Sequence, residues 1–262
     1  MRLRPILERF AGRARGFALL EMGVVLAVLA VMLTGLALPL AAQVQLHRQA
    51  ELRRTLREAR DALLGFAATH GRLPCPAVDG GNGLEAFAPG ADASTGECAT
   101  FYGGYLPAAT LGLAGLDSEG FLRDPWGSPN NRIRYAVYGG AVGGVANPLT
   151  RTDGLQAATL SGIGAAPRFL VICSSGREAT GAGCGPATRQ LTRRAAFVIL
   201  SLGPNATATP APASDEARNL DGDAVFVSHE ASAEPGNAFD DMLLWEPIHL
   251  LTHRLIVAGR LP

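Results

Sequence analysis

The sequence has no surplus of charge of either sign, and it lacks the short motifs of common enzyme classes. Its 23 basic residues balance its 23 acidic residues, so the formal net charge is zero. It contains no Walker A loop, no glycine-rich dinucleotide-binding turn after a strand and no G-x-S-x-G nucleophile turn. An enzyme site requires several side chains with converging roles, and no such set is apparent. We therefore expect a protein that is not an enzyme.

What the sequence does contain is one long apolar segment. Residues 17–42 are apolar almost without interruption, and about 26 residues at a rise of about 1.5 Å are enough to cross a bilayer as one helix. The segment carries a single charge, Glu21. Because a carboxylate inside hydrocarbon costs on the order of 3 kcal/mol, we expect Glu21 to require a cationic partner.

The residues around Glu21 resemble the start of type IV pilins and of the related pseudopilins of type II secretion systems. The resemblance rests on a short basic leader ending at Gly16, followed by Phe17, Glu21 and the apolar helix. In that family a prepilin peptidase cuts after the glycine and methylates the new N-terminal residue, and the glutamate pairs with the N-terminus of a neighbouring subunit. The resemblance implies cleavage between Gly16 and Phe17, methylation of Phe17 and an assembly role for Glu21. A buried carboxylate needs an opposite charge, and an α-ammonium supplies one.

The leader, residues 1–16, holds five arginines and one glutamate. Basic residues stay on the cytoplasmic side, so we expect a single-pass protein of the bacterial inner membrane with a periplasmic domain. The remaining chain has 18 basic and 22 acidic residues, a balance that does not favour nucleic-acid binding. An ordinary signal peptide is an alternative, although its apolar core is shorter and uncharged. An uncleaved membrane anchor is another.

Four cysteines fall into two pairs that are close in sequence, Cys75 with Cys98 and Cys173 with Cys184. In an exported domain an even, locally paired count predicts disulfides, although four cysteines allow three connectivities. Metal binding is the alternative, but neither a C-x-x-C motif nor a suitable Cys/His spacing is present. We predict the disulfides Cys75–Cys98 and Cys173–Cys184.

Residues 43–70 continue the apolar helix in amphipathic form. Apolar residues recur there at spacings of three and four, which places them on one stripe: Leu52, Leu56, Ala59, Leu63 and Phe66. We expect this stripe to pack on a globular domain formed by residues 71–262. The arginines on the other faces have acidic neighbours three or four residues away and no interleaved aromatic residues, which indicates a solvated face and not a nucleic-acid site.

The resemblance to pilins implies an α+β protein with a pilin-like fold. In this fold the long N-terminal helix packs on an antiparallel sheet of about four or five strands, with loop insertions. Residues 71–130 read as a loop-rich insertion, and the turn at 124–127 before the first strand resembles the pattern of major pseudopilins. Strands are expected at 133–138, 168–173, 195–202, 223–228 and 241–245, with a weak strand at 155–160.

Acidic and amide side chains gather in the sequence near the predicted final strands. These residues are Asn219, Asp221, Asp223, Asp240 and Asp241. Calcium takes six to eight oxygen ligands, and the resemblance to major pseudopilins, which bind calcium in a comparable loop, makes these residues a candidate calcium site. The segment lacks the spacing of an EF-hand. A solvated hairpin turn is the alternative, since Asp-Gly favours such turns.

The last part of the chain, residues 246–259, predicts a short helix with a buried stripe made of Ile248, Leu251, Leu255 and Ala258. His249 and His253 have the spacing of two zinc ligands, but Leu250 stands where a metalloprotease has its glutamate. We expect surface or capping histidines.

Together these features predict a minor pilin or pseudopilin, assembled through its N-terminal helix into a type IV pilus or a type II secretion pseudopilus. Its expected partners are prepilin peptidase, other pilin or pseudopilin subunits and the inner membrane. The alternative is a membrane-anchored exported binding module or enzyme that never enters a filament. Co-fractionation with sheared filaments distinguishes the two classes.

Overall fold

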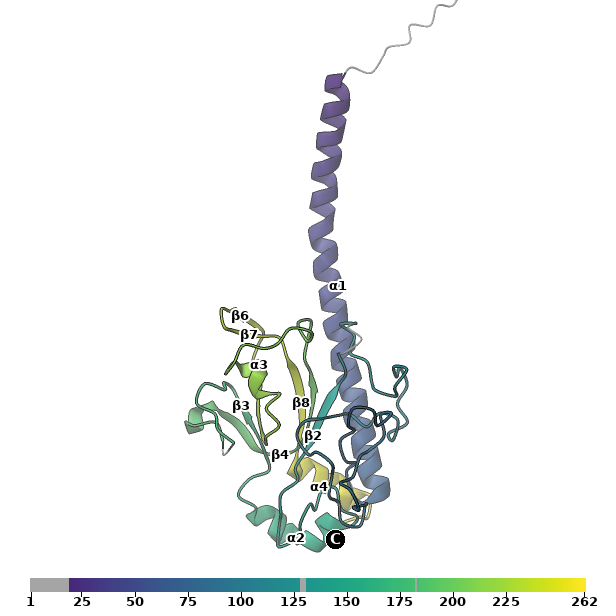
Figure 1. The fold of residues 1–262 in the computed structure, drawn as a ribbon, viewed down its shortest axis with the longest axis vertical. Coiled ribbons are helices and arrows are strands. Elements are labelled where there is room, and N and C mark those ends of the chain that lie inside the picture. Colours follow the sequence, from purple (N-terminus) through teal and green to yellow (C-terminus); the bar gives the residue numbers. More distant parts are fainter. Residues whose placement is uncertain (1–18, 128–130, 182) are drawn as a thin grey trace, which may run out of the picture. The chain divides into compact units, whose positions relative to one another are not determined.

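The computed structural model describes residues 19–127, 131–181 and 183–262, and the side chains of residues 33–42 lie outside this description. The chain forms two compact units, Met1–His47 and Arg48–Pro262. Helix α1, Leu19–His70, contributes to both units (Figure 1). It ends at Gly71, whose φ of 69° is favourable for glycine and whose amide donates to the Ala67 carbonyl at 2.9 Å.

The second unit is a mixed α+β domain. Its strands are β1 (Gly104–Tyr105), β2 (Arg134–Val137), β3 (Leu170–Cys173), β4 (Gln190–Ser201), β5 (Val225–Val227), β6 (Ser232–Glu234), β7 (Asn237–Phe239) and β8 (Met242–Pro247). Its helices, besides the second half of α1, are α2 (Gly154–Ala165), the 3₁₀ turn η1 (Ala187–Arg189), α3 (Asp215–Arg218) and α4 (Ile248–Val257).

The main sheet has six strands and is organised around β4. The strand order is β1-β2-β4-β3-β5, and β8 also pairs with β4. The pairs that involve β4 are antiparallel, as predicted, but β3 and β5 run parallel. The prediction of a purely antiparallel sheet was therefore wrong at this pair. Strands β6 and β7 form a separate two-stranded hairpin.

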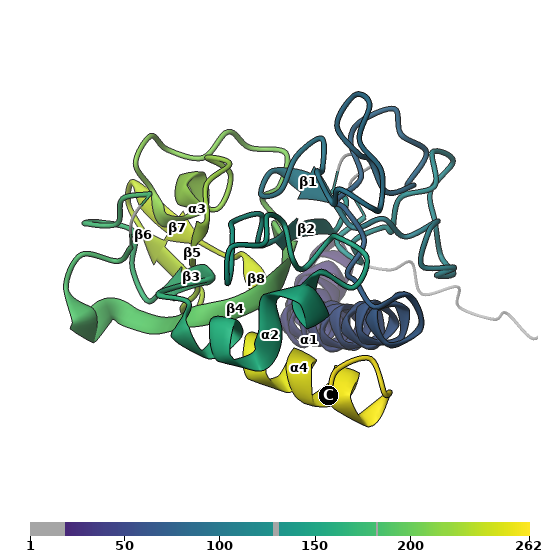
Figure 2. The same cartoon turned by 90° about the horizontal axis from the view of Figure 1, so that it is seen from below.

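Side chains that alternate along β2 and β4 divide the core between the two faces of the sheet. Tyr135 and Phe197 belong to the cluster that includes the buried stripe of α1, whereas Ala136 and Val198 belong to a second cluster. Helices α2 and α4 contribute to the first cluster. Figure 2 shows α4 on one side of β4, with α3 and the β6–β7 hairpin on the other.

The weak strand expected at 155–160 is wrong, because these residues belong to helix α2. The buried residues Leu155 and Ala158 are three apart, which fits one helix face and not the alternation of a strand, and the helix is kinked at Thr159 before the buried Ile163. The short apolar run was ambiguous between the two structures.

The C-terminal helix is shorter than the predicted segment. Pro247 ends strand β8 and precedes α4, and Ile248, Leu251 and Leu255 are buried. The predicted fourth member of the stripe, Ala258, is exposed. This correction has a simple cause: the helix ends at Val257, so Ala258 is the C-cap residue and turns away from the core.

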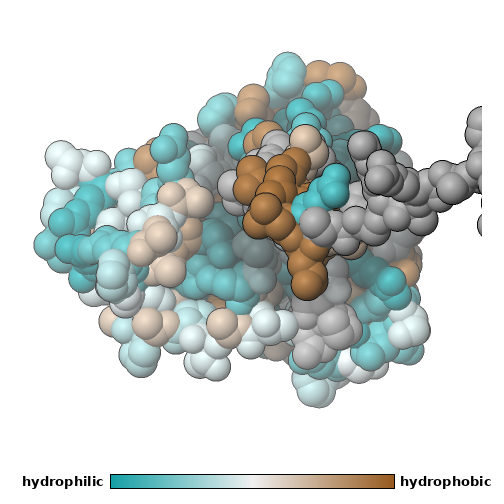
Figure 3. All heavy atoms as spheres, turned by 90° about the horizontal axis from the view of Figure 1, so that it is seen from above, coloured by the Kyte–Doolittle hydropathy of each residue, from teal (hydrophilic) through white to brown (hydrophobic). Residues whose placement is uncertain are grey.

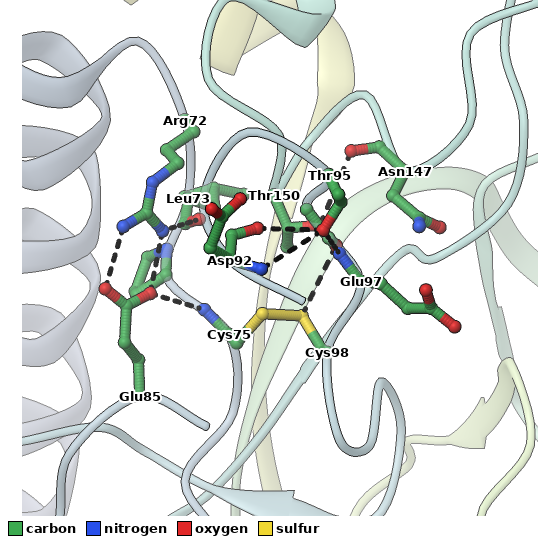
Figure 4. Close-up of a disulfide and its surroundings, with 12 residues drawn as sticks. Arg72, Leu73, Cys75, Glu85, Asp92, Thr95, Glu97, Cys98, Asn147 and Thr150 are labelled. Atoms are coloured by element: carbon green, nitrogen blue, oxygen red, sulfur yellow. Dashed lines mark hydrogen bonds and ion pairs between the residues drawn. A yellow bond between two sulfur atoms is a disulfide. The ribbon is translucent and has the colours of Figure 1, made fainter. Parts of the chain in front are cut away.

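Both predicted disulfides are confirmed. Cys75 is bonded to Cys98 and Cys173 to Cys184. The first disulfide crosslinks the loop-rich segment after α1. Beside it lies a partly buried ion pair, in which Arg72 donates to both carboxylate oxygens of Glu85 at 2.7 Å (Figure 4). Bidentate geometry of this kind is strong and directional, so the chain leaves the helix in a fixed direction.

Candidate functional site

The predicted calcium residues do not come together as one group. Asn219 is buried, and both the oxygen and the nitrogen of its side-chain amide form hydrogen bonds within the protein. The Asn219 Oδ1 accepts from the Val227 amide at 2.7 Å, and its Nδ2 donates to the Val227 carbonyl and to Asp241 Oδ2, at 3.1 and 2.7 Å. Asn219 therefore closes the edge of β5, and its side chain lies against Asp241.

Asp221 and Asp223 are held by a guanidinium group. Arg218, at the end of α3, lies 2.8 Å from Asp221 and 2.7 Å from Asp223. Asp223 Oδ1 also accepts from the amide of Val225, the first residue of β5. These two carboxylates shape the turn between α3 and β5, and the prediction that they bind a cation with Asp240 and Asp241 finds no support in their contacts.

Asp240 and Asp241 instead face an acidic residue that the sequence analysis missed. Oxygen atoms of Glu216, Asp240 and Asp241 all lie within 4.8 Å of one another. Glu216 lies in the first turn of α3, whereas the two aspartates lie between β7 and β8. The Asp240 amide donates to Glu216 Oε1 at 2.9 Å, which fixes the two segments together. We refer to these three residues as the carboxylate cluster.

Burial determines the electrostatics of the carboxylate cluster. Desolvation raises the pKa of Asp241 to about 8, and the negative charges of Glu216 and Asp240 act in the same direction. Desolvation likewise raises the pKa of Asp240 to about 6, with Glu216 as the next largest cause. The cluster therefore holds a proton on Asp241 at neutral pH, which a bound cation would displace.

Polar groups around the cluster leave one oxygen without a donor. Asn205 donates to both carboxylate oxygens of Glu216, at 2.9 and 3.1 Å. Asp240 Oδ1 is buried and has no hydrogen-bond partner within the described part of the chain. Gly203, with a φ of 65°, packs so closely on Asp240 that a Cβ at this position would collide with the carboxylate. Three hard oxygen donors in this arrangement fit calcium, which would need its other ligands from carbonyl groups or water.

The N-terminal residues expected to act in assembly are described only in part. Gly16 and Phe17 lie outside the described residues. Glu21 is in the first turn of α1, where an acidic side chain is favoured by the helix dipole. It is exposed, and Leu19 and Leu20 beside it are 94% and 81% exposed. Figure 3, seen from the start of α1, shows apolar side chains gathered at this end of the helix.

The remaining candidate residues have ordinary surroundings. His249 and His253 lie on the exposed side of α4. Over the residues that the structure describes, no helix is both long enough and apolar enough to span a membrane. Comparisons with protein families, with curated proteins and with solved structures found no match.

Proposed function

We propose that this chain is a structural subunit, a minor pilin or pseudopilin, of a type IV pilus or a type II secretion pseudopilus. It enters the filament after prepilin peptidase has cut between Gly16 and Phe17 and methylated Phe17. Before assembly it crosses the inner membrane once, with residues 17–42 in the bilayer and the globular domain in the periplasm. The pilin-like identity of the fold is part of this proposal.

The observation that carries the proposal is the exposed apolar surface at the start of α1. Large apolar side chains from Leu19 to Met32 are mostly exposed, and Glu21 is the one charged residue among them. Contiguous apolar surface of this kind marks a site that another molecule or a membrane covers. A bundle of like helices would cover it and would leave Glu21 needing a cation, which the α-ammonium of a neighbouring Phe17 supplies.

The packing of α1 in the second unit also supports the proposal. In this unit the buried stripe of α1, from Leu52 to Ala67, packs into the core beside β2 and β4. The helix is therefore anchored in its domain by its second half while its first half keeps its apolar side chains exposed. Two disulfides are consistent with folding in an oxidising compartment such as the periplasm.

The proposal is tested by replacing the assembly residue. Glu21→Ala should leave export and leader cleavage intact and lower the fraction of the protein in sheared filaments by at least roughly tenfold, the change expected when about 1.4 kcal/mol is lost. Glu97→Ala, which removes an exposed carboxylate of the domain, serves as the matched control. Normal incorporation of the Glu21→Ala protein would contradict the assembly mechanism.

The competing function is a membrane-anchored binding module or enzyme outside any filament. It predicts that the native protein stays in the inner-membrane fraction when filaments are sheared from the cells. The exposed start of α1 fits both functions, but a membrane anchor alone gives Glu21 no role. The two are separated by fractionation of the native protein together with the Glu21→Ala variant.

We also propose that the carboxylate cluster of Glu216, Asp240 and Asp241 binds calcium. The unpartnered, buried Asp240 Oδ1 supports this proposal, because a buried polar atom without a partner is costly. Only Asp240 and Asp241 of these ligands were expected from the sequence. The other expected residues, Asn219, Asp221 and Asp223, are held by other contacts.

A further inference from the structure

A cavity of about 360 Å³ lies between the second half of α1 and the segment 113–125. It is wholly within the unit Arg48–Pro262. Its helical wall is formed by Glu51, Thr55, Glu58 and Ala59, which recur at spacings that place them along one flank of the helix. The opposite wall includes the apolar side chains of Leu113 and Leu122 together with the polar groups of Arg123 and Asp124. Its volume is typical of cavities that hold a small ligand or a single long side chain.

Carboxylates outnumber cations in this cavity. Glu51 is exposed, and its side chain makes no hydrogen bond or ion pair with the residues that the structure describes. Glu58 pairs with Arg54 at 2.7 Å, but both side chains are largely exposed, so the pair is weak and exchangeable. Asp124 is buried and accepts hydrogen bonds from Ser201 Oγ and the Trp126 amide. Among the described residues, Arg123 is the one cation that lines the cavity.

An acidic cavity with apolar walls is suited to an arginine side chain. The guanidinium group would pair with the carboxylates of Glu51 and Glu58, and its aliphatic stem would lie along Leu113 and Leu122. The occupant we expect therefore has a long stem with a charged, planar end.

This chain carries such side chains on the other flank of the same helix. Arg53 and Arg57 are exposed. Because successive residues turn by about 100° around a helix, Arg53 lies roughly 200° from Glu51, and Arg57 lies one turn further along the same stripe. The buried stripe that contains Leu52 and Leu56 separates the two flanks. One flank of the helix thus borders the cavity and carries Glu51 and Glu58, with Arg48 over the Trp126 ring and Arg54 paired with Glu58 beside them. The other flank carries the exposed Arg53 and Arg57.

We propose that the cavity receives Arg53 or Arg57 of a second copy of this chain. The contact rests on the proposed function, since a filament places copies of α1 side by side and brings the flank of one helix to the opposite flank of the next. The two surfaces are different patches of one molecule, so the contact is heterologous and leaves a free patch at each end. Such a contact repeats along an assembly and does not close into a dimer.

The test is site-specific cross-linking in intact cells. One tagged chain carries Thr55→Cys in the cavity wall. A second chain with a different tag carries Arg57→Cys and keeps Arg53, which can still enter the cavity of the first chain. All four native cysteines are in disulfides, so the new thiols react alone. A short bis-maleimide should join the two tags. A chain with both substitutions should give a ladder of multimers, and Arg57→Cys paired with Glu97→Cys should give no product.

Charge exchange then tests the chemistry of the contact. Glu51→Arg in the Thr55→Cys chain should lower the cross-linked fraction by roughly fivefold, the size expected for exposed charges. Arg53→Glu in the Arg57→Cys chain should restore it. Circular dichroism of each purified variant verifies that the domain has folded.

The outcomes separate this inference from the proposed function. Filaments that contain the chain without the cross-link would overturn the interface and leave the filament function standing. The cross-link in cells where the chain is absent from filaments would support the interface and contradict that function. A third outcome is that free arginine protects the thiol of Thr55→Cys from an alkylating reagent while no cross-link forms between chains. This result would assign the cavity to a small cationic ligand and overturn the proposal.

Discussion

Asp241 illustrates at the scale of a single residue how burial controls a carboxyl group. It is 8% exposed, and Asn219 donates to its Oδ2, yet desolvation outweighs this hydrogen bond and raises its pKa to about 8. In the unfolded chain the same group titrates near 3.8. The folded protein therefore binds more protons than the unfolded protein across the interval between these values.

This difference predicts the direction of a pH effect on stability. In the presence of a chelator, the free energy of unfolding should fall as pH rises from about 4 to about 8, because the folded state must release protons that the unfolded state has already lost. The contribution of Asp241 should be at least about 1 kcal/mol. It is measured by urea denaturation at pH 5 and pH 8.

Asp241→Asn serves as the comparison for this effect, because asparagine has nearly the same shape and does not titrate. The variant should lose less stability than the wild-type chain between pH 5 and pH 8. Equal losses in the two proteins would show that Asp241 has an ordinary pKa in the folded state.

Individual contacts differ in whether they could be predicted from the sequence. The cysteine pairs could be predicted because their partners are close along the chain and an exported domain favours disulfides. Glu216 was missed because its contact with Asp240 spans 24 residues and is created by the packing of α3 beside the turn before β8. Asp221 and Asp223 were overinterpreted because their neighbour Arg218 takes both carboxylates.

At the scale of elements, the carboxylate cluster joins α3 to the connection between β7 and β8. A cation bound there stabilises the folded domain by mass action. At pH 8, 1 mM calcium should raise the melting temperature relative to excess chelator. If the dissociation constant is near 10 µM, the gain is about 2.7 kcal/mol, or several degrees for a domain of this size.

Glu216→Gln should remove the calcium response, since it takes one charge from the cluster. Asp221→Asn is the matched control, because Asp221 pairs with Arg218 outside the cluster, and this variant should keep the response. A melting temperature that does not depend on calcium in the wild-type chain would eliminate the calcium site.

The elements differ in how clearly the sequence encodes them. The runs that became β2, β3, β4, β5 and β8 are short apolar runs between turns, so their existence could be predicted. Their pairing could not: β3 and β5 are parallel because of a long connection through β4 and α3. The run at 155–160 was too short for its period to decide between a strand and a helix.

At the scale of the whole molecule, the two compact units differ in how far their apolar side chains are covered. The unit Arg48–Pro262 has a core, two disulfides and the cavity beside α1. In the unit Met1–His47, the described part of α1 exposes large apolar side chains that no core covers. The proposed filament function accounts for this arrangement because assembly covers the first unit and leaves the second to make lateral contacts.

The most direct test of this account is the intact mass and the N-terminal sequence of the protein from cells with and without prepilin peptidase. We predict a chain that begins at a methylated Phe17 in cells with the peptidase and a chain that keeps residues 1–16 in cells without it. A leader retained in both strains, or a cut near Ala42, would contradict the account, because the segment would then be an ordinary anchor or a signal peptide.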